Sequence, residues 1–185
     1  VFSYGSPHSG PECPDIWRRE KGLGAYFANL DGVNEYIWYE AAHIWNDFVY
    51  DSGYRNFCMV YPTADGVLDT IQWEAEREGL DDIRYFSYLD RLAQAAIASG
   101  KGALVAQGRK AVQWIELADW HGGDLDELRL GAAERIVSLR ESLFEAGVGE
   151  LPGIDYPSKP QPFVLALPSP PAGASPSSIL SASSS

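Results

Sequence analysis

The sequence predicts an α/β fold that corresponds to the C-terminal portion of a (β/α)8 barrel of the TIM type, with closing helices and a disordered Pro/Ser-rich tail. Strand-like and helix-like segments alternate over residues 1–149, the order typical of parallel α/β folds. Aromatic residues recur where the predicted strands end, and in such a barrel these ends form the active-site face. The few predicted strands cannot close an eight-stranded barrel. We therefore expect a fragment of a longer protein.

The first part of the chain supplies the predicted strands. Short, apolar segments rich in β-branched or aromatic residues occur in "VFSY" (1–4), "EYIWYE" (35–40) and "FCMVY" (57–61). Between the first two, apolar residues recur at roughly helical spacing over residues 16–30. This spacing predicts a helix that ends at Asp31-Gly32.

A loop over residues 62–69 and then a helix are predicted next. Asp69 is the expected N-cap of this helix, with Gln72 as its capping-box partner. Gly79 is expected to weaken the helix, and Asp81 to cap a new start. We therefore predict an interrupted helix.

Three further patterns complete the helical part. An apolar face over residues 83–97 ends at Gly100, and another helix is expected over residues 103–120. The last helix is expected to begin at Asp124, with Glu127 as capping partner. It should bury a stripe over residues 128–143 and stop at Gly147.

Composition limits the function classes. The net charge is −12 and Lys and Arg form no block, which argues against nucleic acid and against an anionic membrane surface as partners. No apolar run approaches the ~20 residues of a membrane span. The histidines match no metal spacing, and we expect no cofactor. Cys13 and Cys58 could pair or stay free. Residues 150–185 have the composition of a linker or disordered tail.

The stretch "YPTADGVLDTIQWEAEREGLDDIRYFSYL" (61–89) resembles a motif near the end of the catalytic barrel in proteins similar to glycoside hydrolase family 123. The matching positions are Tyr61-Pro62, Asp65-Gly66, Glu74, Arg77, Glu78, Gly79, Asp81, Asp82, Tyr85 and Leu89. A weaker resemblance extends over residues 1–147.

This resemblance implies a barrel that hydrolyses β-linked N-acetylgalactosaminides, or related terminal N-acetylhexosamines, with retention and with the substrate's acetamido group as nucleophile. The consecutive Asp-Glu pair of such enzymes belongs to an upstream strand. Here Asp126-Glu127 lies in the first turn of a predicted helix. We expect the catalytic pair in the rest of the barrel, in a longer parent chain, and no activity from this chain alone.

The predicted substrate contacts are aromatic residues and a carboxylate at strand ends: Tyr4, Trp38, Glu40 and Tyr61. Aromatic faces pack against the apolar face of a pyranose, and a carboxylate accepts hydrogen bonds from its hydroxyls. The aromatic residues could equally be core residues.

Motif residues also have structural interpretations. Glu74, Arg77 and Glu78 could bind a hydroxyl group of the sugar, but an ion pair within the helix is the simpler interpretation. Asp81 and Asp82 suit a helix cap better than an acidic dyad. Trp73 is expected to pack against the sheet.

Two alternatives to the hydrolase stay open. The first is a non-catalytic carbohydrate-binding or scaffold domain that folds from these residues alone. The second is an unrelated α/β enzyme, for which the sequence offers no catalytic constellation.

Overall fold

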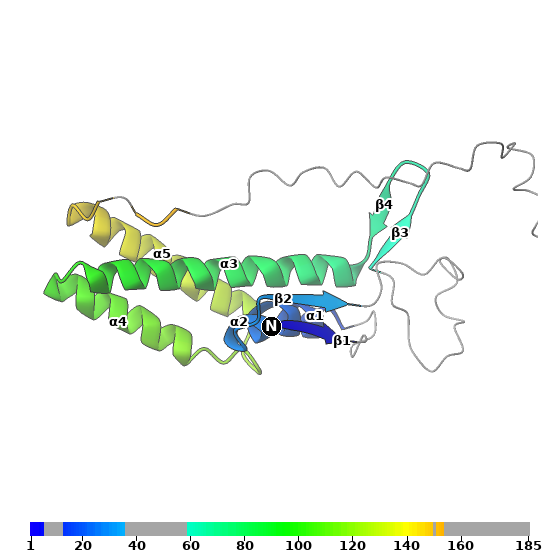
Figure 1. Cartoon of the computed structure of the whole chain (residues 1–185), viewed down its shortest axis with the longest axis horizontal. Coiled ribbons are helices and arrows are strands. Elements are labelled where there is room, and N and C mark those ends of the chain that lie inside the picture. Colours follow the sequence, from blue (N-terminus) through cyan, green and yellow to red (C-terminus); the bar gives the residue numbers. More distant parts are fainter. Residues whose placement is uncertain (6–12, 36–58, 150, 154–185) are drawn as a thin grey trace, which may run out of the picture. The chain divides into compact units, whose positions relative to one another are not determined.

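The computed structural model describes residues 1–5, 13–35, 59–149 and 151–153, and the described residues belong to one compact unit, Val1–Gly153 (Figure 1). The part of the chain that the structure describes is predominantly helical and has a few short strands. Of the predicted tail, all but residues 151–153 lies outside the described residues, as does Cys58.

Strands β1 (Phe2–Gly5) and β2 (Gly32–Glu35) pair in parallel, in a register that joins Phe2 to Gly32 and Gly5 to Glu35. The connection contains helix α1 (Pro14–Arg19), the π-helical turn η1 (Glu20–Gly24) and the short helix α2 (Ala25–Phe27). The α/β class and the helix between the two strands are thus confirmed. The second strand begins earlier than predicted, and residues 36–40 lie outside the described residues.

The prediction of a loop after Tyr61 is wrong. Strand β3 (Val60–Pro62) pairs antiparallel with β4 (Val67–Asp69), and residues Thr63 and Gly66 close the turn through a backbone hydrogen bond of 2.8 Å. Asp65-Gly66 is a sequence that favours tight hairpin turns, so it joins two short strands here. Among the described strands, β3 pairs with β4 and not with β1 or β2.

The predicted interruption at Gly79 is also wrong, because α3 (Ile71–Ala98) is a single helix of 28 residues. A Cβ atom on Gly79 would lie 2.7 Å from the carbonyl oxygen of Arg18 and 3.0 Å from the backbone nitrogen of Gly22. The glycine therefore serves a close approach between α3 and the α1–η1 segment. Packing of the whole helix outweighs the ~1 kcal/mol that a helical glycine costs.

The N-cap of α3 is Thr70, one residue after the predicted Asp69. The Thr70 hydroxyl accepts a hydrogen bond from the backbone N–H of Trp73 at 3.3 Å and donates one to the carbonyl oxygen of Met59 at 2.7 Å. Gln72 is buried and does not complete the predicted capping box. Thr70 thus ties the start of α3 to the residue before β3.

Helices α4 (Gly102–Glu116) and α5 (Leu125–Glu145) follow, and α4 is shorter than predicted. The carboxylate of Asp124 accepts hydrogen bonds from the backbone N–H groups of Asp126 and Glu127, which confirms the predicted N-cap. Gly100 and Gly147 both have positive φ, of 68° and 63°, which confirms the two predicted helix ends.

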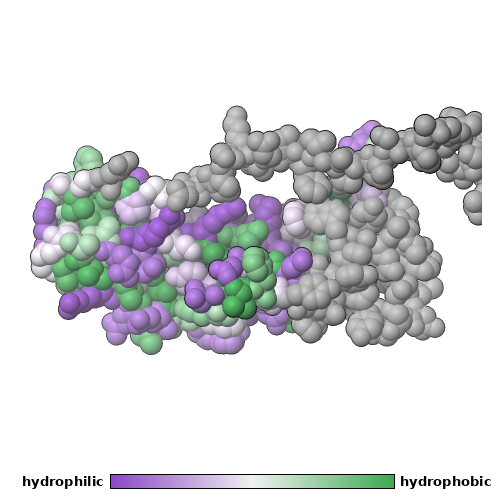
Figure 2. All heavy atoms as spheres, in the orientation of Figure 1, coloured by the Kyte–Doolittle hydropathy of each residue, from purple (hydrophilic) through white to green (hydrophobic). Residues whose placement is uncertain are grey.

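The core lies among α3, α4 and α5, with contributions from η1 and α2. It contains fifteen buried residues, among them Phe86, Leu89, Leu92, Leu139 and Leu143. The buried faces of α3 and α5 are those that apolar periodicity predicts, although Ile83, Ile97 and Leu128 are only half-buried. On the face drawn in Figure 2, hydrophobic and hydrophilic side chains of the described residues are interspersed. Among the described residues, none of the helices is long and apolar enough for a membrane span.

Candidate functional site

The structure describes only part of the predicted sugar-binding set. Trp38 and Glu40 lie outside the described residues. Tyr4 lies in β1 opposite Asn34, and Tyr61 is half-buried in β3 opposite Leu68. These two tyrosines belong to different two-stranded sheets.

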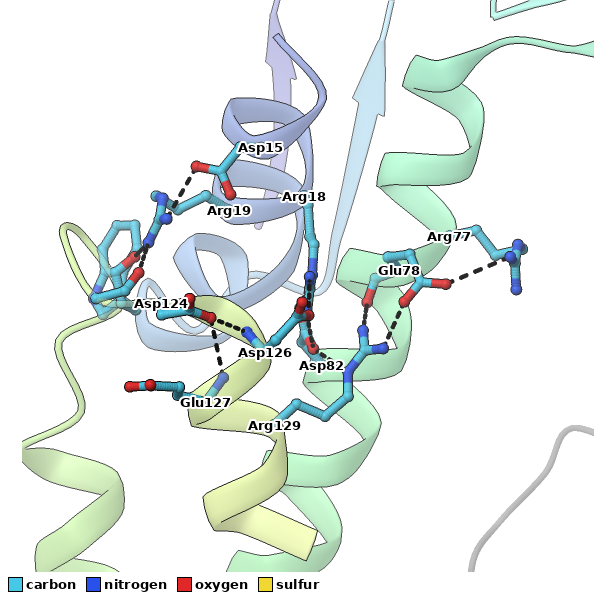
Figure 3. A network of polar contacts seen from close by, with 12 residues as sticks. Asp15, Arg18, Arg19, Arg77, Glu78, Asp82, Asp124, Asp126, Glu127 and Arg129 are labelled. Atoms are coloured by element: carbon cyan, nitrogen blue, oxygen red, sulfur yellow. Dashed lines mark hydrogen bonds and ion pairs between the residues drawn. The ribbon is translucent and has the colours of Figure 1, made fainter.

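The densest polar arrangement in the described residues is centred on Asp82 of α3, whose side chain is 1% exposed. Arg18 of α1 donates to both carboxylate oxygens, from Nε to Oδ2 at 2.7 Å and from Nη2 to Oδ1 at 3.1 Å. Arg129 of α5 donates from Nε to Oδ1 at 2.6 Å. Figure 3 shows the two arginines converging on this carboxylate from two other helices.

Two further carboxylates complete the arrangement, which we call the Asp82 clamp: Arg18, Glu78, Asp82, Asp126 and Arg129. Arg129 donates to the Glu78 carboxylate at 2.5 Å and to the Glu78 carbonyl oxygen at 2.7 Å. Arg18 donates to Asp126 at 2.6 Å. The clamp therefore joins α1, α3 and α5.

Burial and hydrogen bonding oppose one another at both guanidinium groups. Burial lowers the pKa of Arg18, but hydrogen bonds to Asp82 and Asp126 outweigh it and the pKa is raised overall. The pKa of Arg129 is raised in the same way, against burial, by hydrogen bonds to Glu78 and Asp82. The hydrogen bond from Arg18 holds the pKa of Asp126 below its ordinary value.

The clamp is suited to holding helices together and is unsuited to acid–base chemistry. Both arginines stay charged at any physiological pH, and both oxygens of Asp82 already accept hydrogen bonds from them. A charge that is paired and hydrogen-bonded in this way can stay buried. We therefore assign the motif position Asp82 a positioning role between helices.

The other motif residues form ion pairs, but the predicted helix cap at Asp81 and Asp82 is wrong, because both residues lie inside α3. Asp81 instead accepts a hydrogen bond from Arg84 at 2.6 Å, one turn along α3. Arg77 donates to Glu74 at 2.9 Å and 2.5 Å, and this pair is exposed. The hydrogen bond to Glu74 raises the pKa of Arg77. The ion pair expected for this helix turn is thus present.

Trp73 is a packing residue, but it packs against residues of helices and the residue before β3 instead of the predicted sheet. It is half-buried against a small cluster formed by Trp17, Met59 and Ala75. This cluster places the start of α3 beside α1 and the residue before β3, so the tryptophan belongs to the packing of the unit.

Sequence reasoning missed Arg18 and Arg129. Arg18 is separated from Asp82 by 64 residues and Arg129 by 47 residues. Helix-surface rules relate residues three and four positions apart, and neither arginine meets them. The only indication in the sequence that this turn of the helix contacts other elements is the motif, which places Gly79 and Asp82 one turn apart on the same helix.

Arg19, the second arginine of α1, holds the loop between α4 and α5. Arg19 donates to the carbonyl oxygens of Trp120 and Gly123, at 2.6 and 3.0 Å, and to the carboxylate of Asp15 at 3.0 Å. Gly123 precedes the N-cap of α5. Arg18 and Arg19 together therefore fix α1 against the start of α5.

One cavity of the described residues is an open groove of about 830 Å³ between α2, β2, α3 and the end of α4. Its lining includes Tyr26, Leu80 and Ile83 together with Lys21 and Asp90. Burial raises the pKa of Tyr26, and the Asp90 carboxylate adds to the effect. Tyr61, whose side chain the structure describes, does not line this groove.

Metal-ligating residues do not gather in the part of the chain that the structure describes, where no group of three His, Cys, Asp or Glu side chains could hold an ion. Cys13 is half-buried and is a free thiol.

Comparisons with protein-family models, with curated proteins and with solved structures gave no match to this chain.

Proposed function

We propose that the chain is part of a protein similar to the hydrolases of glycoside hydrolase family 123, acting on terminal β-linked N-acetylhexosamine glycans by substrate-assisted, retaining hydrolysis. In this proposal the chain supplies late strands and closing helices of a (β/α)8 barrel. The catalytic Asp-Glu pair comes from polypeptide outside the described residues, and this chain alone is inactive.

The observation that carries the proposal is the parallel pairing of β1 with β2 around an intervening helix. Parallel strands have their carboxyl ends at one edge, which is where a barrel of this class binds its substrate. Tyr4 lies near that end of β1, and Trp38 and Glu40 follow the corresponding end of β2 in the sequence. In the sequence, three of the four predicted contacts therefore lie at, or shortly after, the ends of two strands that pair.

The motif residues support the same proposal in another way. Gly79 lets α3 approach the helical segment between β1 and β2, and Asp82 binds Arg18 of that segment. A family motif that fixes closing helices against a strand–helix–strand unit needs no catalytic residue of its own. The resemblance can therefore coexist with a motif that is structural.

The test is hydrolysis of 4-nitrophenyl N-acetyl-β-D-galactosaminide and of the glucosaminide, by this chain and by the full polypeptide of the reading frame that contains it. We expect no turnover by the chain. We expect turnover by the full polypeptide, which Asp→Asn and Glu→Gln substitutions in a strand-terminal Asp-Glu pair should abolish. A full polypeptide that lacks such a pair, or that is folded and hydrolyses neither substrate, would overturn the proposal.

Tyr61 offers a matched pair of variants in the active polypeptide. Tyr61→Phe keeps the aromatic face and loses only the hydroxyl, whereas Tyr61→Ala loses both. We expect Tyr61→Ala to raise KM about tenfold and Tyr61→Phe to raise it much less. Equal kinetics for both variants and the unsubstituted enzyme would remove Tyr61 from the substrate contacts.

A non-catalytic carbohydrate-binding or scaffold domain is a second candidate, favoured by the continuous apolar core of the described residues. That candidate requires cooperative thermal unfolding of this chain by itself. N-acetylgalactosamine binding, measured by calorimetry and lost in Trp38→Ala, would then favour a carbohydrate-binding domain over a scaffold.

A further inference from the structure

Helix α5 has a second apolar face, directed away from its core. The three large hydrophobic residues Leu130, Val137 and Phe144 are 60%, 56% and 80% exposed. They follow one another at seven-residue intervals. Seven residues are nearly two helical turns, so the three side chains form one row along the helix. We call them the apolar row.

The apolar row lies about 100–140° around α5 from the centre of its buried stripe. The stripe consists of Leu125, Ala132, Ile136, Leu139 and Leu143 and packs into the core of the unit. At about 100° per residue, Val137 lies roughly 100° from Ile136 and farther from Leu139. Core packing therefore does not account for the apolar row.

A row of carboxylates runs beside it. Glu127, Glu134 and Glu141 are exposed, and each precedes a member of the apolar row by three positions. Residues at this spacing are neighbours on a helix surface. Within the described residues, none of these three carboxylates has a hydrogen-bonding or ion-pair partner. We call them the acidic row.

Apolar residues at heptad spacing, with charges at the flanking positions, are the features by which one helix selects another. The apolar row gives the contact, and the flanking charges set the choice of partner. A cationic partner would neutralise the acidic row, whereas an acidic one would be repelled. The chain itself is strongly acidic, with a net charge of −12.

We propose that the outward face of α5 binds an amphipathic helix of a partner protein whose apolar heptad row is flanked by Lys or Arg. A second copy of α5 fits this face poorly. Packed antiparallel about Val137, it would bring Glu134 of one copy near Glu141 of the other. In α5 itself, Arg129 is already held by Glu78 and Asp82, and Arg140 is exposed. The exposed Lys110 of α4 lines the same shallow pocket as Glu134, and no ion pair joins the two among the described residues.

The experiment uses the full chain and two labelled synthetic helical peptides that have the same Leu heptads and differ only in Lys or Glu at the flanking positions. Fluorescence anisotropy titrations measure the affinity of each. We expect the Lys peptide to bind, more weakly at higher salt, and the Glu peptide not to bind. Equal binding of both peptides, or binding of neither, would overturn the proposal.

Substitutions locate the binding to α5. The triple variant Glu127→Gln/Glu134→Gln/Glu141→Gln should bind the Lys peptide about tenfold more weakly, since three exposed charge pairs of about 0.5 kcal/mol each are lost. Val137→Ser should weaken it as well. The matched control Glu20→Gln/Asp65→Asn/Glu116→Gln removes the same charge elsewhere and should have little effect. An equal loss of affinity in the control variant would show that the Lys peptide binds by general electrostatic attraction, and would overturn the proposal.

Sedimentation of the unliganded chain tests whether a second copy of the chain occupies the outward face of α5. We expect a monomer whose mass is unchanged by Val137→Ser. A dimer that Val137→Ser dissociates would show that the face is filled by another copy, and would likewise overturn the proposal.

Discussion

The two halves of helix α3 are held by different physical means. From Ile71 to Asp82 the helix relies mainly on the Thr70 cap, on the close approach at Gly79 and on the ion pairs of Asp82, beside the small apolar cluster of Trp73 and Ala75. From Phe86 onward it relies on apolar side chains that point into the core, such as Leu89 and Leu92. The helix is nevertheless continuous across the change.

The difference shows what local sequence can and cannot reveal. An apolar face is visible as a periodicity whatever it packs against, because every apolar partner suffices. A buried carboxylate or a helix-to-helix glycine contact depends on particular partners, and these lie on α1 and α5. The polar half of α3 should therefore be the half that responds most selectively to conservative changes.

The largest effect is expected at Asp82. Asp82→Ala leaves the guanidinium groups of Arg18 and Arg129 without their shared carboxylate, and breaking a buried ion pair on one side costs about 3–5 kcal/mol. Denaturant unfolding measures the loss. The control, Asp81→Ala, removes a partly exposed pair with Arg84 and should cost about 0.5 kcal/mol or less. Similar losses for both variants would contradict the role of the clamp.

In the apolar half, Leu89→Ala should lower the free energy of unfolding by about 3 kcal/mol, through lost burial and a cavity. Leu80 is 40% exposed on the same helix, and Leu80→Ala should cost less than about 1 kcal/mol. Equal costs would mean that the two side chains do not differ in burial as described.

Gly79→Ala reverses the usual effect of this substitution in a helix. Alanine normally favours a helix by about 1 kcal/mol, but here its Cβ would meet the Arg18 carbonyl oxygen. We expect a destabilisation of about 2 kcal/mol, of the size seen for overpacking. Gly102→Ala is the control, since no atom lies within 4 Å of the added Cβ, and it should be neutral or slightly stabilising. A stabilised Gly79→Ala variant would contradict the close approach.

Thr70→Ala removes the N-cap of α3 and should cost about 1 kcal/mol. Asp69→Ala, one residue earlier, should have almost no effect. Thermal unfolding measures both variants, and Thr70→Ala should have the lower melting temperature. The opposite order would indicate that Asp69 is the cap.

The smallest effect is expected at Asp126, which is 82% exposed and lies in the first turn of α5. Asp126→Asn should cost less than about 0.5 kcal/mol at neutral pH, because solvent screens the pair with Arg18. The pKa of Asp126 is lowered by that arginine, so its contribution is present above about pH 4 and is lost as the pH falls further. Unfolding of both proteins between pH 7 and 3 tests this, and a difference that grows toward low pH would be the wrong sign.

The sequence was a good guide to some elements and a poor guide to others. The strand at residues 1–4, the α5 cap at Asp124 and the stops at Gly100 and Gly147 each follow from a few neighbouring residues, and all are confirmed. The hairpin after Tyr61 and the unbroken α3 were missed. In α3, local rules predict that Gly79 weakens the helix, whereas its effect depends on Arg18 and Gly22 in a distant part of the sequence.

The candidate site divides in the same way. Motif residues Gly79 and Asp82 stood out in the sequence, but their partners Arg18 and Gly22 did not, since no local rule connects them. Tyr4 and Tyr61 were placed on strands, and both strands are present. Their contact with a sugar, together with that of Trp38 and Glu40, stays a prediction.

The most direct test of the clamp is a double-mutant cycle between Arg18 and Asp82, with Arg18→Gln, Asp82→Asn and the double variant compared by denaturant unfolding. If Asp82 ties α3 to α1, the two substitutions should be coupled by about 1–3 kcal/mol. If their costs add within about 0.5 kcal/mol, the two side chains act independently, and the motif aspartate does not hold these helices together.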